Sequence, residues 1–190
     1  PHWKLDIDNP TTFGNIIGPA YYYKKRRAMQ EAQQNAKQLI PKIAKEWKKA
    51  SGYFHGDLFE YYKCEGAEHI LLSMGAIGAE SKIAIDEMQK AGLKIGLARV
   101  RVIRPFPTEE IIKLGKQADL IVIDRNISVG LEGALFNEVK AALYDESDAK
   151  ATGFIAGLGG KDVTYKDIET MCRKAMKGST KAQEWYGMED

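Results

Sequence analysis

The sequence contains few cysteines, because Cys64 and Cys172 are the only two among 190 residues. They are far apart and form no CxxC pair. Iron–sulfur clusters and structural zinc sites need closely spaced cysteines, and disulfide-stabilised secreted domains need several, so this usage argues against all three. We therefore expect a reducing, cytoplasmic setting and no metal site in this chain.

The chain also has no excess of one charge and no long apolar run. Lys and Arg number 28 against 26 Asp and Glu, which gives a formal net charge of +2. Nucleic-acid and membrane-surface binders usually carry a strong basic field, so we expect neither partner. No apolar run reaches the length of a membrane span, and the first residues contain no apolar region of a signal peptide.

Recognisable catalytic motifs are missing as well. His2, His55 and His69 have no Ser, Cys or carboxylate at the spacing of a nucleophile and its base, and there is no HxxxH or HExxH pattern. No complete phosphate-binding motif is present either. We predict no catalytic residue in this chain, and its sequence identifies no cofactor-binding residue.

What the sequence does contain is 44% hydrophobic residues, enough for one sizeable core, arranged in a regular alternation. Short β-branched runs alternate with helical patterns, which implies right-handed crossovers and a parallel sheet covered on both faces. The predicted fold class is α/β with three layers, α/β/α. Strands are expected at 69–74, 94–103, 120–124 and 151–156, and helices near 79–91, 108–117, 131–144 and 165–176.

Two segments precede this alternation. Residues 1–20 contain scattered Pro and Gly and are expected to form an extended linker. Residues 21–52 carry apolar side chains at three-and-four spacing and predict one long amphipathic helix, kinked at Pro41 and ended by Gly52. The α/β domain then occupies 53–190. It begins with a short strand at 58–62, for which the following tight turn favours an antiparallel neighbour or a corner.

Three polar residues follow the most apolar predicted strand. Asp124, Arg125 and Asn126 come directly after its Ile and Val residues, and strand carboxyl ends are where open α/β sheets place their working loops. These side chains could orient a ligand or contact a partner chain. Alternatively, Asp124 and Asn126 could bond to the backbone of their own turn. Both interpretations remain open, and the three residues form our candidate partner-contact loop.

Three glycine-containing loops are expected at the same edge of the sheet, and one of them contains Gly130 and Gly133. Residues 75–78 (GAIG) join a strand to a helix, where they could bind phosphate or allow close packing. Residues 157–162 (GLGGKD) fit a tight turn as well as a binding site. The basic run 24–27 (KKRR) stands at the amino end of the long helix, where the helix dipole disfavours cations. It is either a solvated face or a contact for an acidic surface.

Several segments together resemble one family. The chain is similar to the carboxyl-terminal part of the alpha subunit of 2-oxoacid:ferredoxin oxidoreductases, and most similar to the pyruvate enzymes. Each segment alone is weak evidence for the family. Their order and spacing together are specific to the family, although not to one oxoacid. The segments are 8–14 (DNPTTFG), 18–22 (GPAYY), 96–107 (GLARVRVIRPFP), 124–128 (DRNIS), 133–140 (GALFNEVK) and 157–162 (GLGGKD).

The resemblance implies a fold like the carboxyl-terminal domain of transketolase, with about five strands of which the first is antiparallel. It also implies that residues 1–20 lead from a missing amino-terminal domain. Thiamine diphosphate, magnesium and iron–sulfur clusters would be bound by other parts of the enzyme, so no family catalytic residue maps onto this chain. The partners would be the beta, gamma and delta subunits, with ferredoxin and coenzyme A contacted indirectly.

On this basis the domain would be a structural, subunit-contacting part of an enzyme that decarboxylates a 2-oxoacid, and it would be inactive alone. Two alternatives remain. One is a stand-alone nucleotide- or acyl-carrier-binding module that uses the glycine loops. The other is the equivalent domain of a transketolase-like or dehydrogenase-like thiamine enzyme.

Overall fold

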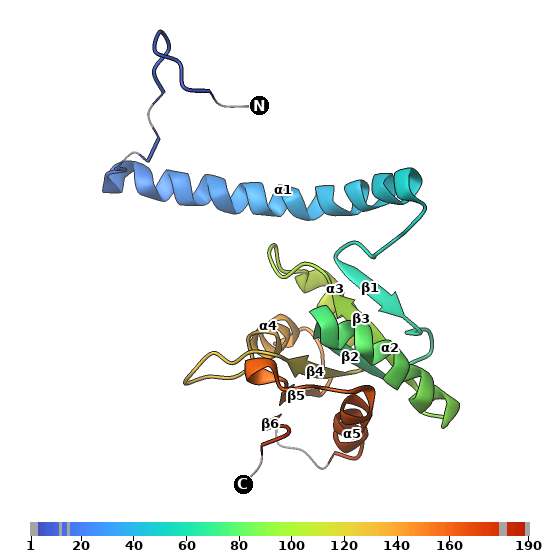
Figure 1. The fold of residues 1–190 in the computed structure, drawn as a ribbon. Helices are drawn as coiled ribbons and strands as arrows, with labels where there is room; N and C mark the ends of the chain where they lie inside the picture. The colour runs from blue at the N-terminus through green and yellow to red at the C-terminus, as the bar shows by residue number, and fades with distance from the viewer. Residues whose placement is uncertain (1–3, 12, 15, 179–181, 189–190) are drawn as a thin grey trace.

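The computed structural model describes residues 4–11, 13–14, 16–178 and 182–188, and its centre is a six-stranded sheet covered by helices on both faces (Figure 1). His2 lies outside the described residues. The elements in chain order are α1 (Pro19–Ser51), β1 (Phe59–Tyr62), β2 (His69–Met74), α2 (Gly75–Lys90), β3 (Ile95–Val100), α3 (Thr108–Gly115), β4 (Asp119–Asp124), α4 (Ala134–Leu143), β5 (Ala151–Ile155), the short 3-10 turn η1 (Leu158–Gly160), α5 (Tyr165–Met176) and β6 (Gln183–Trp185).

The strands lie in the order β1-β3-β2-β4-β5-β6. β1 pairs antiparallel with β3, and every other neighbouring pair is parallel. The prediction of an α/β fold with an antiparallel first strand is therefore confirmed. β3 lies between β1 and β2, so the short turn after β1 leads to a corner and not to a hairpin.

Alternation along the strands divides the core between the two faces of the sheet. On β2, Leu71 points into one buried cluster, whereas Ile70 and Leu72 point into the other. The Leu71 cluster lies beneath α2 and α5, and the opposite cluster lies beneath α3 and α4. The central strand β4 supplies side chains to both clusters and is almost wholly buried. The predicted three layers are present.

β6 was not predicted from the sequence. Its three residues form no apolar run, so pattern alone gives no strand signal. The strand forms because β5 has an open edge: the Gly153 N–H donates to Ala182 O at 2.8 Å, and the Tyr186 N–H donates to Ile155 O at 2.9 Å. An unpaired sheet edge accepts any segment that can satisfy its backbone groups.

The boundaries of two helices differ from the prediction for local reasons. α2 begins at Gly75, not near residue 79, because the positive φ of Gly75 (57°) turns the chain directly from β2 into the helix. α4 begins at Ala134, not at 131. The intervening residues form a turn in which the Ser128 N–H donates to Glu132 O at 2.9 Å.

α1 is one continuous helix of 33 residues, with Pro41 inside it and Gly52 as its left-handed cap. None of its residues is buried. Ile40 packs against the α3 and α4 side of the core, and Lys37 forms an ion pair with Glu109 at the start of α3. In Figure 1 the helix lies along one side of the α/β domain and is joined to it by the segment before β1.

We predict that the amide hydrogens of α1 exchange faster than those of β4 in the isolated chain, and most clearly before Pro41. β4 is buried between two strands, whereas α1 has few tertiary contacts to resist local opening. Hydrogen–deuterium exchange with mass spectrometry measures both segments in one experiment. Equally slow exchange in both would mean that the domain's own core holds α1.

Candidate functional site

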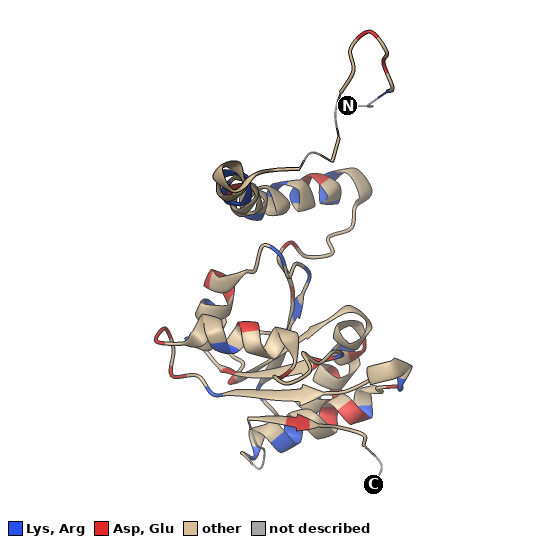
Figure 2. Cartoon of the chain, turned by 90° about the vertical axis from the view of Figure 1, so that its left-hand side faces the viewer, with Lys and Arg blue, Asp and Glu red and all other residues tan. Residues whose placement is uncertain are grey.

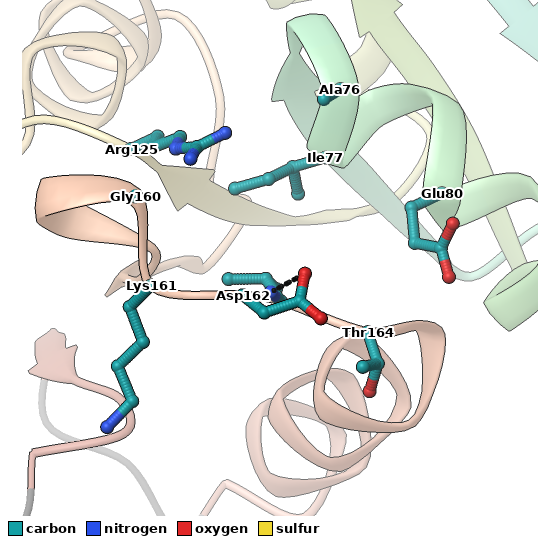
Figure 3. Close-up of a pocket in the computed structure, with 9 residues that line it drawn as sticks. Ala76, Ile77, Glu80, Arg125, Gly160, Lys161, Asp162 and Thr164 are labelled. Carbon is teal, nitrogen blue, oxygen red and sulfur yellow. Dashed lines mark hydrogen bonds between the residues drawn. The ribbon is translucent and has the colours of Figure 1, made fainter.

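The loops that follow β2, β4 and β5 meet at the carboxyl edge of the sheet, as their positions in the sequence predict. They line a cavity of about 340 Å³, shown in Figure 3. The chain passes from β2 to one side, through α2 and β3, and then crosses to β4 on the other side. Crevices at such a change of direction are the usual ligand positions in open α/β sheets. The lining residues are Ala76, Ile77, Glu80, Arg125, Gly160, Lys161, Asp162, Val163 and Thr164.

Asp124 does not face this cavity but is buried against α4, with 2% of its surface exposed. Its carboxylate accepts the N–H of Leu135 at 3.1 Å and the N–H of Phe136 at 2.9 Å, and Asn126 Nδ2 donates to it at 3.1 Å. Burial raises the pKa of Asp124 above its ordinary value, because desolvation outweighs these three donors. Asp124 therefore ties the end of β4 to the first turn of α4.

Neighbouring groups complete this connection. The residue before α4 is Gly133, which has no side chain to cap the helix. Asn126 Oδ1 accepts the Ala134 N–H at 2.9 Å, and Gln183 of β6 accepts the Gly133 N–H at 3.1 Å. A Cβ on Gly133 would lie 2.2 Å from the Asp124 carboxylate, so glycine is required there. Asp124 and Asn126 thus bond to the start of the next helix, and not to their own turn.

Two of the three residues are exposed: Asn126, which bonds to α4, and Arg125, which alone lines the cavity. The Nε of Arg125 donates to Gly157 O at 2.9 Å, which joins the β4 loop to the β5 loop. The side chain extends along the cavity toward Ile77 (Figure 3). No carboxylate pairs with its guanidinium in the part of the chain that the structure describes.

Of the two glycines in residues 75–78, Gly75 provides a positive φ and has open space around it, whereas Gly78 serves close packing. A Cβ on Gly78 would lie 2.6 Å from Cγ of Arg99, so α2 approaches β3 only because this residue is glycine. Arg99 itself donates to Glu60 at 3.0 Å. In the other glycine loop, Gly157, Gly159 and Gly160 all have positive φ, as a tight turn requires.

The charges around the cavity are mixed. Glu80 and Asp162 supply carboxylates, and both accept backbone N–H groups, from Tyr165 at 3.0 Å and from Val163 at 3.0 Å. Lys161 points away from the cavity and donates to Gly187 O (Figure 3). This balance of charges does not favour a polyphosphate ligand. Glu80 and Thr164 were missed in the sequence because residues 84 positions apart have no shared motif.

The cysteines are suited to packing and not to nucleophilic chemistry. Cys172 lies on the buried face of α5, and burial raises the pKa of its thiol to about 12. Cys64 is partly buried, donates to Leu97 O at 3.1 Å, and also has a pKa raised by burial. Neither thiol ionises readily near neutral pH.

Within residues 4–11, 13–14, 16–178 and 182–188, no group of three His, Cys, Asp or Glu residues is placed to hold a metal ion. In the same residues, no helix has both the length and the apolar character to cross a membrane.

Comparison with solved structures identifies the class of fold. A 2-oxoglutarate:ferredoxin oxidoreductase from Magnetococcus marinus matches with a TM-score of 0.50 and 18% sequence identity, over 67% of this chain and 21% of that chain. A split gene transketolase, in an inactive beta4 tetramer, matches with a TM-score of 0.51 and 14% identity, over 60% of this chain and 39% of that chain. The transketolase-like fold predicted from the sequence is confirmed.

Comparison with protein families is more specific. Residues 67–168, more than half of the chain, match the family of the pyruvate:ferredoxin oxidoreductase core domain II. The chain belongs to this family. The matched residues run from the approach to β2 into α5 and include the loops that follow β2, β3, β4 and β5.

Curated relatives extend the match. The pyruvate synthase subunit PorA of Methanothermobacter thermautotrophicus is 36% identical over 100% of this chain and 49% of its own length. The ketoisovalerate oxidoreductase subunit VorA of Pyrococcus horikoshii is 35% identical over 95% of this chain and 48% of its own length. The chain thus spans about half the length of these relatives. Because these two sequence identities are almost equal, they do not indicate which oxoacid is used.

We predict that Asp124→Ala lowers the free energy of unfolding by about 3 kcal/mol, because two buried N–H groups of α4 lose their acceptor. Asn126→Ala is the matched control. It removes the acceptor of the Ala134 N–H at the exposed end of the helix and one of the three donors to Asp124, but it leaves the Asp124 carboxylate in place, so it should cost only about 1 kcal/mol. Urea denaturation followed by circular dichroism measures both variants. Equal losses would show that burial of the carboxylate contributes nothing extra.

Proposed function

We propose that this chain is a structural, subunit-contacting domain of a thiamine-diphosphate-dependent 2-oxoacid:ferredoxin oxidoreductase. The observation that carries the proposal is membership of the core domain II family combined with coverage of only about half of each relative's length. The reaction of the whole enzyme is decarboxylation of a 2-oxoacid to an acyl-CoA and CO2, with electrons passed to ferredoxin. Pyruvate is the proposed substrate, since PorA is a pyruvate synthase subunit.

The residues of this chain do not fit the cofactors of such an enzyme. An iron–sulfur cluster needs several accessible thiolates, whereas Cys172 is enclosed in the core and Cys64 bonds to backbone carbonyls. The cavity at the carboxyl edge is lined by one inward-directed cation, Arg125, and by the two carboxylates of Glu80 and Asp162, so its charge does not suit a diphosphate. We assign these groups to other parts of the enzyme, in a cytoplasmic setting.

Arg125 is the member of the candidate partner-contact loop that we assign to assembly. Asp124 and Asn126 are engaged with α4, whereas the guanidinium of Arg125 is exposed and has no ion-pair partner within the described residues. An exposed guanidinium on a rigid loop is well suited to bidentate contact with a carboxylate of another domain.

We predict that Arg125→Ala changes the free energy of unfolding of the isolated chain by less than about 1 kcal/mol, since it loses one exposed bond. In the complete enzyme the same change should weaken subunit association or oxoacid-dependent activity several-fold. Lys177→Ala is the control, because Lys177 is exposed and lies at the carboxyl end of α5, the end opposite Thr164 and the cavity. It should leave both the free energy of unfolding and the enzyme's assembly and activity unchanged. A large stability loss in the isolated chain would assign Arg125 to the fold instead.

The proposed function is tested by comparing the isolated chain with the complete enzyme. The isolated chain should unfold cooperatively but should not reduce a dye acceptor with any 2-oxoacid, with or without added thiamine diphosphate and magnesium. When the chain is produced together with the remaining polypeptides, activity should appear. Turnover by the isolated chain, or full activity of the enzyme without this domain, would refute the proposal.

A further inference from the structure

The cavity at the carboxyl edge of the sheet (the edge cavity) presents charges of both signs that do not pair with one another. Arg125 comes from the loop after β4, Glu80 from α2 and Asp162 from the loop after β5, so three elements surround the cavity (Figure 3). In the part of the chain that the structure describes, no ion pair joins the guanidinium to either carboxylate. All three charges are therefore available to a ligand.

Each of these groups uses only part of its hydrogen-bonding capacity. Glu80 and Asp162 each accept one backbone N–H through one oxygen, at 3.0 Å in both cases. Arg125 donates from Nε to a backbone carbonyl at 2.9 Å. The second oxygen of each carboxylate and the two terminal nitrogens of the guanidinium have no hydrogen-bond partner among the described residues. The backbone contacts thus hold the side chains in place, and the remaining atoms can bind another molecule.

The mixed charge decides which ligands suit the edge cavity. A phosphate or a single carboxylate would pair with Arg125 but would be repelled by Glu80 and Asp162, and a single cation would be repelled by Arg125. Lys161 does not change this balance, because it points away from the cavity and donates to Gly187 O (Figure 3). The best match is therefore a ligand that carries one acidic and one basic group.

The overall charge of the domain does not provide this selection. α1 carries nine Lys and Arg residues against two acidic residues, a net charge of +7, and the other 157 residues carry 19 basic and 24 acidic residues, a net charge of −5. Outside α1, however, the two signs are interspersed over the elements of the domain (Figure 2). Recognition at the carboxyl edge therefore depends on the positions of individual charges and not on a uniform field.

The loop that supplies the cation of the edge cavity also carries two exposed apolar side chains. Val129 and Leu131 (the apolar tip) are 93% and 65% exposed. Their turn is ordered, because the Leu131 N–H donates to Ser128 O at 2.8 Å and Glu132 forms an ion pair with Lys140 of α4. A small ligand in the cavity would give these side chains no role, whereas a polypeptide that covers the loop would bury both. The apolar tip therefore favours a polypeptide as the occupant.

We propose that the edge cavity and the apolar tip form a docking surface for another polypeptide of the same oxidoreductase, which inserts an acidic and a basic side chain into the cavity. The acidic side chain pairs with Arg125, and the basic one pairs with Glu80 and Asp162. The apolar tip is buried in the same contact. The inference rests on the proposed function, which supplies the partner, and it adds the chemistry by which that partner is recognised.

The first test removes charges from the edge cavity and keeps the fold. Glu80→Gln combined with Asp162→Asn leaves a side-chain oxygen for each backbone N–H, so the melting temperature of the chain should not change. Association of the full chain with the remaining polypeptides of the oxidoreductase, measured by titration, should weaken about tenfold. Arg125→Gln should also weaken association, because the acidic side chain of the partner then loses its cation.

Glu146→Gln combined with Asp148→Asn is the matched control. The same two chemical changes then lie in the loop between α4 and β5, at the amino edge of the sheet, where both residues are exposed. Neither makes an ion pair with any described residue. Association should remain as in the wild type. Equal weakening in this control would show that overall charge governs association, and the proposal would be refuted.

The second test addresses the apolar tip. Val129→Ser combined with Leu131→Ser should weaken association about tenfold, because two apolar side chains are no longer buried against the partner. Tyr144→Ser is the control, since Tyr144 is 77% exposed but follows the carboxyl end of α4, at the other edge of the sheet. It should associate normally. Unchanged association of the tip variant would remove the argument for a polypeptide and overturn the proposal.

Three further results would contradict the proposed chemistry. Tighter association of the Glu80 and Asp162 variant would show that the partner offers only acidic groups, and tighter association of Arg125→Gln would show that it offers only basic ones. Saturable binding of glycine to the isolated chain, measured by calorimetry and lost in the Glu80 and Asp162 variant, would assign the cavity to a free zwitterion. In each case the enzyme still assembles, so the proposed function stands. If the chain does not associate with the remaining polypeptides at all, the proposed function fails and this inference fails with it.

Discussion

The carboxyl edge of this domain depends on the buried carboxylate of Asp124. It stands at the end of the central strand and accepts two N–H groups from the first turn of α4, whose own preceding residue has no side chain to cap it. The glycine at position 133 allows the close approach, and Gln183 from the last strand supports the same turn. A single acidic group thus fixes the strand, the helix and the loop between them.

Because of this constraint, the three consecutive residues 124–126 have different roles. Asp124 and Asn126 bond to α4, whereas the side chain of Arg125 extends along the cavity. Because Asp124 and Asn126 are held by α4, the loop is rigid, and Arg125 is presented to solvent from a fixed base. An arginine on a rigid loop loses little conformational freedom when it binds, which suits a contact between domains. The loop therefore combines a folding role and a proposed assembly role without using the same side chains for both.

α1 has the opposite character. None of its residues is buried, its apolar side chains Leu39, Ile43 and Trp47 are half-exposed, and its charge is opposite to that of the rest of the chain. A helix in this state gains little stability from its own domain. Its sequence makes physical sense as part of a larger assembly, consistent with relatives that are about twice as long.

The sequence by itself determined the α/β class, the alternation from β2 to α5, the long helix across Pro41 and the family, because these depend on local periodicity and on the order of short motifs. It also placed the polar loops at one edge, since parallel strands all end on the same side. Only the tertiary structure decided that Asp124 is buried and that Gly78 makes room for Arg99, because their partners lie far along the chain. The same holds for β6, whose three residues form a strand only beside the open edge of β5.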